Sequence, residues 1–178
     1  PSYTSIFIFF YFFKHDFETL KNFLIKNINL ESQEIFEERI ITIDVYYNIE
    51  VGLDLEYMSL KTKLSIDEII KIHSDKLYDV YAVGFLPGFA YLASVDERIA
   101  LPRLSSPRKQ IPKGSVAIAD TQTAVYPQAS PGGWNIVGRT AMKLFDKNLE
   151  TLSPFNVGDK VKFNPISKEE FLLQGGII

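Results

Sequence analysis

The 178-residue sequence contains no cysteine and only two histidines. The absence of cysteine excludes disulfide bonds, thiol nucleophiles and thiolate metal sites. The histidines, His15 and His73, lie far apart and belong to no HExxH pattern, so we expect no protein-bound zinc or other transition metal. The longest apolar run, residues 6–13, is too short to cross a bilayer and lacks a signal-peptide cleavage site. We therefore expect a cytoplasmic protein.

Negative charge is scarce in one part of the chain. Between Arg98 and Arg139, six basic side chains accompany a single acidic one, Asp120, which gives this segment a net charge of +5. The remaining residues contain 13 basic and 21 acidic side chains, a net charge of −8, and the whole chain has −3. The overall charge argues against nucleic acid as the main partner. The positive segment instead points to an anionic ligand or an acidic partner.

Proline is absent and glycine nearly absent from residues 2–83, whereas residues 84–138 contain six of each. The contrast predicts regular α/β structure followed by a region of short strands and turns, typical of a β-barrel or sandwich. We predict an α+β protein with a small N-terminal α/β sandwich domain, residues 1–80, and a β-rich domain, residues 81–178.

Capping signals and apolar patterns place the elements. Asp16 and Asp54 are predicted N-caps, and Ser65 with Glu68 forms a predicted capping box. The predicted helices cover residues 17–29, 54–60 and 65–76. The predicted strands cover residues 3–13, 39–47, 78–85, 115–119, 134–139, 142–145 and 160–164.

The glycine pair in residues 130–134 (SPGGW) is the first candidate for ligand binding. Adjacent glycines let the backbone approach a ligand and aim N–H groups at an anion. A strand after Trp134 is expected to return Arg139 near this loop. The alternative is a tight turn with Trp134 anchored in the core.

Residues 84–92 (GFLPGFAYL) combine a turn with three aromatic rings. The Pro-Gly pair predicts a type II turn with Gly88 at positive φ. Phe89 and Tyr91 are candidates for an aromatic wall that stacks on a planar ligand. The alternative is that Phe85 and Phe89 fill one end of a barrel.

Two arginines, Arg103 and Arg108, each follow a proline. A stiff backbone before a guanidinium suits bidentate recognition of carboxylate or phosphate. A solvated loop with surface arginines is the alternative.

Other candidates carry polar groups without a full catalytic set. His73 falls on the apolar face of its predicted helix, so it is either a satisfied interior residue or a catalyst. Gln122, Thr123 and Tyr126 offer neutral hydrogen bonds or simply turn chemistry. The positive segment contains no Ser-His-Asp order and no paired loop carboxylates, and the sequence has no P-loop.

From residue 46 to 166 the sequence resembles the allophanate hydrolase subunit 1 family. This family includes the B subunit of 5-oxoprolinase, the sporulation-kinase inhibitors and part of urea carboxylase. The matching segments are residues 54–56 (DLE), 72–74 (IHS), 84–92, 102–103 and 107–108 (both PR), 111–119 (IPKGSVAIA), 122–123 (QT), 126–127 (YP) and 130–140 (SPGGWNIVGRT). The resemblance implies that the second domain is a cyclophilin-like β-barrel.

The resemblance also implies a function. The chain is expected to be a non-autonomous subunit of an ATP-dependent amidohydrolase that opens 5-oxoproline to glutamate. Its implied partners are a homologous subunit 2 and a third subunit, with ATP and Mg used by the complex. The alternatives are a protein that inhibits a histidine kinase and a component of the allophanate or urea-carboxylase pathway.

The predicted site combines these motifs. His73, Arg108 and Arg139 are the predicted catalytic residues, and Phe89 and Tyr91 form the predicted aromatic wall. The predicted substrate- and anion-binding residues are Arg103, Gln122, Tyr126, Ser130, Gly132, Gly133 and Trp134. Asp120 and Ala124 stand where the family usually has glycine, which implies either a changed loop or an added carboxylate at the site.

Overall fold

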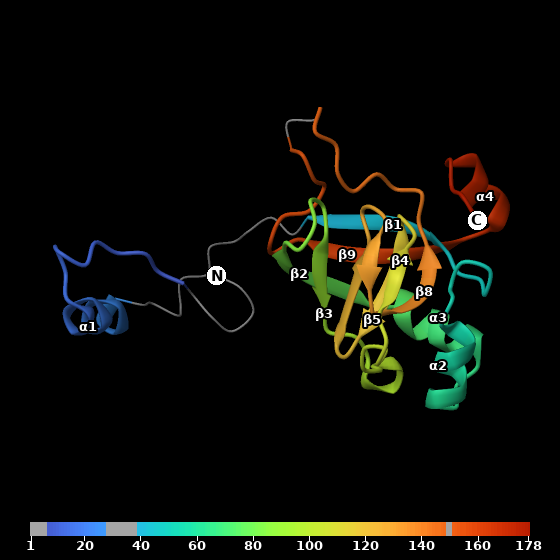
Figure 1. The fold of residues 1–178 in the computed structure, drawn as a ribbon, viewed down its shortest axis with the longest axis horizontal. Helices are drawn as coiled ribbons and strands as arrows, with labels where there is room; N and C mark the ends of the chain where they lie inside the picture. The colour runs from blue at the N-terminus through green and yellow to red at the C-terminus, as the bar shows by residue number, and fades with distance from the viewer. Residues whose placement is uncertain (1–6, 28–38, 149–150) are drawn as a thin grey trace. The chain divides into compact units, whose positions relative to one another are not determined.

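A computed structural model describes residues 7–27, 39–148 and 151–178 (Figure 1). The chain forms two compact units, Pro1–Glu37 and Glu38–Ile178. These limits differ from the predicted domains, 1–80 and 81–178, because residue 80 lies inside a strand of the second unit.

The described part of the second unit is built around a closed barrel of seven strands, in the order β1-β8-β5-β6-β3-β2-β9. Side chains from all seven strands meet in one buried cluster, which is the barrel interior. The strands are β1 (Ile40–Tyr46), β2 (Leu77–Val83), β3 (Ala90–Ala93), β5 (Ser115–Ala119), β6 (Gln122–Val125), β8 (Asn135–Arg139) and β9 (Lys160–Ile166).

Parallel pairing of β1 with β9 closes the barrel, whereas the other neighbouring strands are antiparallel. The strand predicted over residues 39–47 is therefore confirmed as a strand, but it belongs to the barrel. Its partner lies about 120 residues later in the chain, as the hydrogen bond between Asp44 and Asn164 shows. Local sequence carries no signal for such a pairing, which is why it favours a separate N-terminal sandwich instead.

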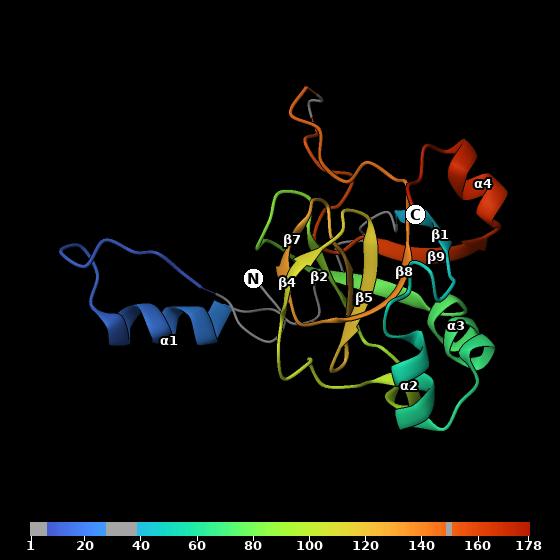
Figure 2. The same ribbon diagram turned by 45° about the vertical axis from the view of Figure 1, so that its right-hand side comes forward.

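Smaller elements cover the barrel (Figures 1 and 2). Helices α2 and α3 lie side by side at one end in both views, with the short 3₁₀ helix η1 packed against them. Helix α4 lies near β1, where Phe171 stacks on Tyr46. A separate two-stranded sheet joins β4 to β7. These elements are α2 (Leu55–Thr62), α3 (Ile66–Ser74), η1 (Glu97–Ile99), β4 (Arg108–Ile111), β7 (Ser130–Gly132) and α4 (Lys168–Leu173).

The residues predicted as N-caps of α2 and α3 lie at the starts of these helices, but only one of them makes the predicted capping hydrogen bond. The capping box of α3 is confirmed, because Ser65 accepts from the Glu68 N–H and the Glu68 carboxylate accepts from the Ser65 N–H. Asp54 precedes α2 as predicted, but its side chain makes no capping hydrogen bond. Its carboxylate instead binds Arg108 and the Ile136 N–H.

The strands predicted at β1, β2, β5, β8 and β9 are confirmed, and each end agrees to within two residues. The strand predicted over residues 142–145 is wrong, since residues 140–146 form no regular element. The sequence does not predict the short strands β3, β4, β6 and β7, because three or four residues give too little periodicity to read.

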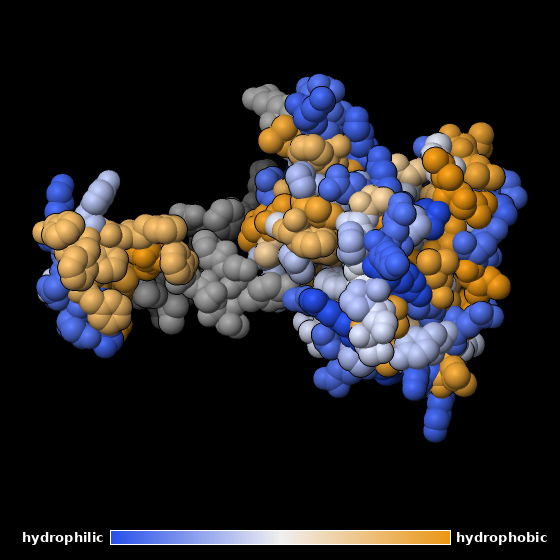
Figure 3. All heavy atoms as spheres, viewed as in Figure 1, coloured by the Kyte–Doolittle hydropathy of each residue, from blue (hydrophilic) through white to orange (hydrophobic). Residues whose placement is uncertain are grey.

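The first unit contains helix α1 (Phe17–Asn27), which confirms the predicted helix over its described residues. Asp16 caps it by accepting from the Thr19 N–H at 2.9 Å. The predicted strand 3–13 is wrong over residues 7–13, which form no strand, and its residues 3–6 lie outside the described part. Apolar side chains cover much of this unit's surface (Figure 3), with Phe7 and Phe13 80% and 100% exposed.

None of the helices within the described residues combines the length and apolar character that crossing a bilayer requires.

Candidate functional site

An aromatic cluster lies on the outer face of the barrel. Strand β5 alternates: Val116 and Ile118 belong to the interior cluster, and Ala117 and Ala119 belong to a second buried cluster on the opposite face. The small alanines leave room above the sheet for rings. Phe89 is central to this second cluster. Its ring meets those of Phe85, Tyr91, Tyr126 and Trp134 edge to face, with centroids 4.9–5.8 Å apart.

A cavity of about 310 Å³ opens beside this cluster. Its wall combines residues 84–92, both Pro-Arg pairs, Tyr126 and the glycine pair, which are far apart in the sequence. We call it the aromatic cavity. Its lining residues are Phe85, Phe89, Tyr91, Arg103, Leu104, Pro107, Tyr126, Pro131, Gly132, Gly133 and Trp134.

Arg103 provides the cationic group in this wall. Its guanidinium carbon lies 5.7 Å from the centre of the Trp134 ring, at cation–π distance. Asn135, which no sequence motif singles out, fixes the loop that carries Arg103. Its buried side-chain amide donates to the carbonyl of Pro102 at 3.0 Å and to that of Ile118 at 3.1 Å. The backbone next to Arg103 is therefore hydrogen-bonded to the barrel, whereas the Arg103 residue itself is exposed.

Tyr126 provides a neutral hydrogen-bonding group. Burial raises the pKa of Tyr126 to about 12, although the nearby Arg103 charge opposes this shift. The phenol therefore stays protonated at neutral pH and can donate to an anion. Its hydroxyl lies so close to Gly132 that a β-carbon at this position would collide with it.

The turn before the cavity carries backbone strain. Gly88 has φ +82°, as its Pro-Gly position predicts. Phe85 also has a positive φ, +73°, which is unfavourable for a residue with a β-carbon, and this residue is 62% exposed at the cavity wall. Such strain often occurs at ligand-binding sites.

The two glycines allow a matched pair of variants. Gly132→Ala places a β-carbon against Tyr126 and 2.6 Å from Ile111, whereas the same change at Gly133 meets nothing closer than 3.4 Å. We expect Gly132→Ala to displace the Tyr126 ring and to shift the fluorescence of Trp134, the single tryptophan. Gly133→Ala should leave the spectrum unchanged. Equal spectra for both variants would contradict the close contact between Gly132 and Tyr126.

His73 lies in the core, away from the aromatic cavity. It is fully buried, and its ring stacks on Phe163 with centroids 4.6 Å apart. Thr123 donates to the Ala117 carbonyl at 3.0 Å, so its oxygen accepts from Nε2–H of His73 at 2.9 Å, and Nδ1 accepts from the Tyr47 hydroxyl at 2.8 Å. Burial lowers the pKa of His73 to about 3. The ring is thus neutral and fully hydrogen-bonded, which is the interior role that the sequence allowed.

Arg108 is also committed to a structural contact. Its two terminal nitrogens donate to the Asp54 carboxylate at 2.9 and 2.7 Å, and the same carboxylate accepts from the Ile136 N–H at 2.7 Å. Arg108 pairs with Gly132 across β4 and β7. The ion pair therefore connects the sheet that carries Gly132 to β8 and to the start of α2. The sequence does not reveal this role of Asp54, since nothing local links it to Arg108.

The remaining predicted residues lie elsewhere. Gln122 and Ser130 are outside the cavity lining, and Arg139 lies at the far end of β8 from Trp134, so the expected return of Arg139 to the glycine loop does not occur. Asp120 adds no carboxylate to the lining. It occupies a left-handed turn with φ +50° between β5 and β6, a conformation that glycine and aspartate tolerate.

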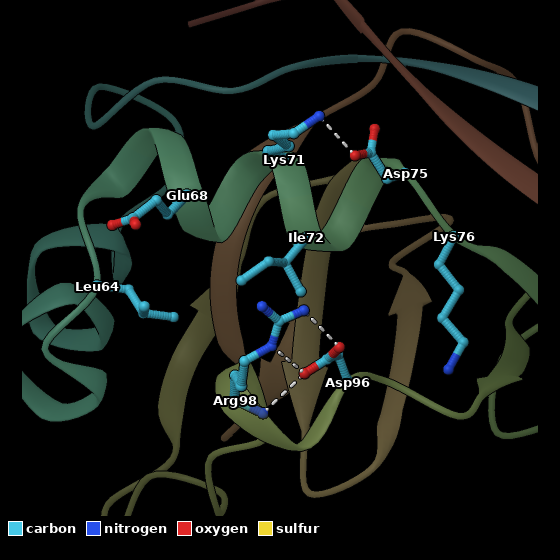
Figure 4. Close-up of a pocket in the computed structure, with 8 residues that line it drawn as sticks. All are labelled: Leu64, Glu68, Lys71, Ile72, Asp75, Lys76, Asp96 and Arg98. Carbon is cyan, nitrogen blue, oxygen red and sulfur yellow. Dashed lines mark hydrogen bonds and ion pairs between the residues drawn. The ribbon is translucent and has the colours of Figure 1, made fainter.

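A second, more polar cavity of about 470 Å³ lies between α3 and η1 (Figure 4). Its charged groups neutralise one another: Lys71 pairs with Asp75 at 2.7 Å and Arg98 with Asp96 at 2.8 Å. These exposed pairs leave little net charge for a ligand, so the aromatic cavity is the better candidate.

The aromatic cavity offers groups that suit ligand binding, but no catalytic base. No histidine, aspartate or glutamate is among those lining residues that the structure describes. Within residues 7–27, 39–148 and 151–178, no group of three or more metal-ligating side chains is present. The wall therefore offers a cation, a phenol and π faces to a small, partly planar anion.

Known proteins share much of this sequence. The B subunit of 5-oxoprolinase from Bacillus subtilis is 40% identical over 186 aligned residues, which cover 96% of this chain and 76% of that protein. The B subunit of 5-oxoprolinase from Haemophilus influenzae is 42% identical over 128 residues, which cover 72% of this chain and 60% of that protein.

Solved structures share the fold. The crystal structure of protein PH0987 from Pyrococcus horikoshii is 44% identical with a TM-score of 0.73, over 91% of this chain and 74% of that one. The Kluyveromyces lactis urea carboxylase, 17% identical, has a TM-score of 0.65 over 76% of this chain and 14% of that one, which shows a shared fold. A family model described as carboxyltransferase domain, subdomains C and D, matches residues 1–155. The chain therefore belongs to the family of carboxyltransferase domains C and D.

Proposed function

We propose that this chain is a subunit of a 5-oxoprolinase-type complex, in which its aromatic cavity binds the substrate. The observation that carries the proposal is the cavity, in which Arg103 stands over Trp134 beside the protonated Tyr126. A small planar lactam with one carboxylate, such as 5-oxoproline, complements that set. The names of the relatives at 40–42% identity support the same substrate.

The reaction needs activation because an amide carbonyl is a poor electrophile. Transfer of the γ-phosphoryl group from ATP to the lactam oxygen releases ADP and makes the carbon electrophilic. Water adds to this carbon, the carbon–nitrogen bond breaks with a proton to nitrogen, and hydrolysis of the acyl phosphate releases glutamate and phosphate. In this scheme Arg103 balances the negative charge of the bound substrate, Trp134 packs against the lactam ring and Tyr126 donates a hydrogen bond to the substrate.

This chain does not complete the reaction alone in our proposal. The described residues of the cavity lining include no base to activate water, and the sequence contains no P-loop. We therefore assign Mg–ATP and the proton-transferring groups to the implied subunit 2 and third subunit. We also propose that the barrel is cyclophilin-like, as the family resemblance implies.

Arg103→Gln tests the proposal, with Arg98→Gln as its matched control. The complex is assembled from this chain and its two implied partner subunits, and ATP-dependent release of glutamate from 5-oxoproline is measured. Loss of a charge-assisted contact predicts roughly a tenfold to hundredfold lower kcat/KM for Arg103→Gln. Arg98 lies outside the aromatic cavity, paired with Asp96, and its replacement should change activity by less than about twofold.

Absence of glutamate release from a correctly assembled wild-type complex would overturn the proposed function. Equal activity of the two variants would leave the complex in place but remove the aromatic cavity as its substrate site.

A further inference from the structure

Another cavity, with a positive wall, lies at the far end of β8. It encloses about 260 Å³ and shares no lining residue with the aromatic cavity. We call it the Arg139 cavity. Trp134 and Arg139 stand five positions apart, roughly 16 Å along an extended strand, so the two cavities are separate. The lining residues of the Arg139 cavity are Pro112, Lys113, Arg139, Thr140, Ala141, Gly175, Gly176 and Ile177.

Arg139 is a buried guanidinium for which the described residues provide no counterion. The residue is 8% exposed, and its Nη1 donates to the Ile177 carbonyl at 2.9 Å. Its Nε is buried without a hydrogen-bond partner among the described residues. Burial lowers the pKa of Arg139, and no described carboxylate opposes this effect. Buried charges are normally paired, so this geometry is incomplete without an acceptor.

A second unsatisfied donor stands opposite Arg139. Ser115 on β5 lies directly opposite Arg139 on β8 in the strand register. Its hydroxyl is likewise buried without a hydrogen-bond partner in the described structure. Cross-strand partners project from the same face of a sheet with β-carbons about 5 Å apart. An N–H and an O–H that both seek an acceptor complement an oxygen that only accepts, such as a carboxylate or phosphate oxygen.

The rim of the Arg139 cavity adds positive charge. Lys113 is exposed there, and no aspartate or glutamate occurs among the lining residues in the described part of the chain. The residues after α4 form the opposite wall, in which Gly176 packs so closely on the Phe171 ring that a β-carbon would collide with it. The Ile177 carbonyl, held on Arg139, is placed where one oxygen of an anion would bind.

We propose that Arg139, Ser115 and Lys113 form a binding site for a small oxyanion, a carboxylate or phosphate group, and that residues 175–177 close over it. The carbonyl of Ile177 substitutes for one ligand oxygen, so an entering anion displaces it from Arg139. The site is separate from the aromatic cavity and does not depend on the function proposed for that cavity.

The test titrates the full chain with inorganic phosphate, acetate and chloride at equal ionic strength, and follows the Nε–H resonance of Arg139 by ¹⁵N NMR. Phosphate, acetate or both should shift this resonance in a saturable manner, and chloride should not. Lys113→Ala should weaken binding roughly threefold to tenfold. Its matched control, Lys109→Ala, removes an exposed cation outside the cavity and should leave the affinity unchanged.

Gly176→Ala dislodges the covering segment and should strengthen binding several-fold. Saturation by phosphate alone assigns a phosphate group, and saturation by acetate alone assigns a carboxylate. The proposal is overturned if neither anion shifts the Arg139 resonance beyond chloride, or if Lys113→Ala binds as tightly as the wild type. Because Lys113 is exposed, its variant keeps the test valid even where an Arg139 variant fails to fold.

Discussion

Replacing Asp54 by alanine is expected to lower the free energy of unfolding by about 3–5 kcal/mol. Asp54 is only 4% exposed. Its carboxylate accepts three hydrogen bonds, two from Arg108 and one from the Ile136 N–H. Its removal leaves a half-buried guanidinium and a buried backbone N–H without a partner. Because the Arg108 side chain is 28% exposed, water can partly solvate it after the change, and we expect a loss at the lower end of this range. Urea-induced unfolding measures the change.

A double-mutant cycle separates the ion pair from its surroundings. Asp54→Ala, Arg108→Ala and the double variant should give a coupling energy of about 1–3 kcal/mol. Asp75→Ala removes the exposed partner of Lys71 and should cost less than about 0.5 kcal/mol. A loss below about 1 kcal/mol for Asp54→Ala would show that the pair behaves as a surface contact. Because Arg108 faces Gly132 across β4 and β7, Asp54→Ala should also shift Trp134 fluorescence.

Acid is expected to destabilise the protein through His73. Burial lowers the pKa of His73 in the folded protein to about 3, whereas an unfolded histidine has a pKa of about 6.5. Between these values the unfolded chain binds a proton that the folded protein does not. The contribution of His73 to stability is therefore complete above pH 6.5 and is lost as the pH falls toward 3, by up to about 1.4 kcal/mol per pH unit.

His73→Gln removes this titration while keeping polar atoms near Tyr47 and Thr123. Urea-induced unfolding at pH 7.5, 6.5, 5.5 and 4.5 should show a shallower loss of stability for His73→Gln than for the wild type. His15→Gln, at an exposed position, should follow the wild type. NMR of the wild-type ring should report neutral imidazole down to pH 4.5. Protonation of the folded ring near pH 6 would contradict the prediction.

Local signals in the sequence predict the elements that depend on local chemistry. The capping box at Ser65 and Glu68 places α3, and the apolar pattern of residues 115–119 places β5 at the observed residues. The strands of three or four residues escape prediction because their partners define them. The apolar run at residues 6–13 also suggests a strand, yet residues 7–13 have no strand partner among the described residues of their unit.

The site shows the same division. Short motifs supply most of the aromatic cavity: residues from 84–92, Arg103 of the first Pro-Arg pair, and the glycine pair meet in one wall. The roles of Arg108 and His73 depend on partners that no motif contains, namely Asp54 for the first and Tyr47 with Thr123 for the second. Arg139 is expected near the glycine pair, but an extended strand carries it away from Trp134.

The parallel pairing of β1 with β9 governs the order of events during synthesis. Residues 40–46 are translated first among the barrel strands, and their closing partner, residues 160–166, is translated last. The ring of hydrogen bonds cannot be completed before then, so β1 keeps an open edge through most of translation. An open strand edge is a site of non-native pairing with other chains. Barrel closure is thus a late step of folding, and protection of β1 until that step is a requirement for efficient production of the protein.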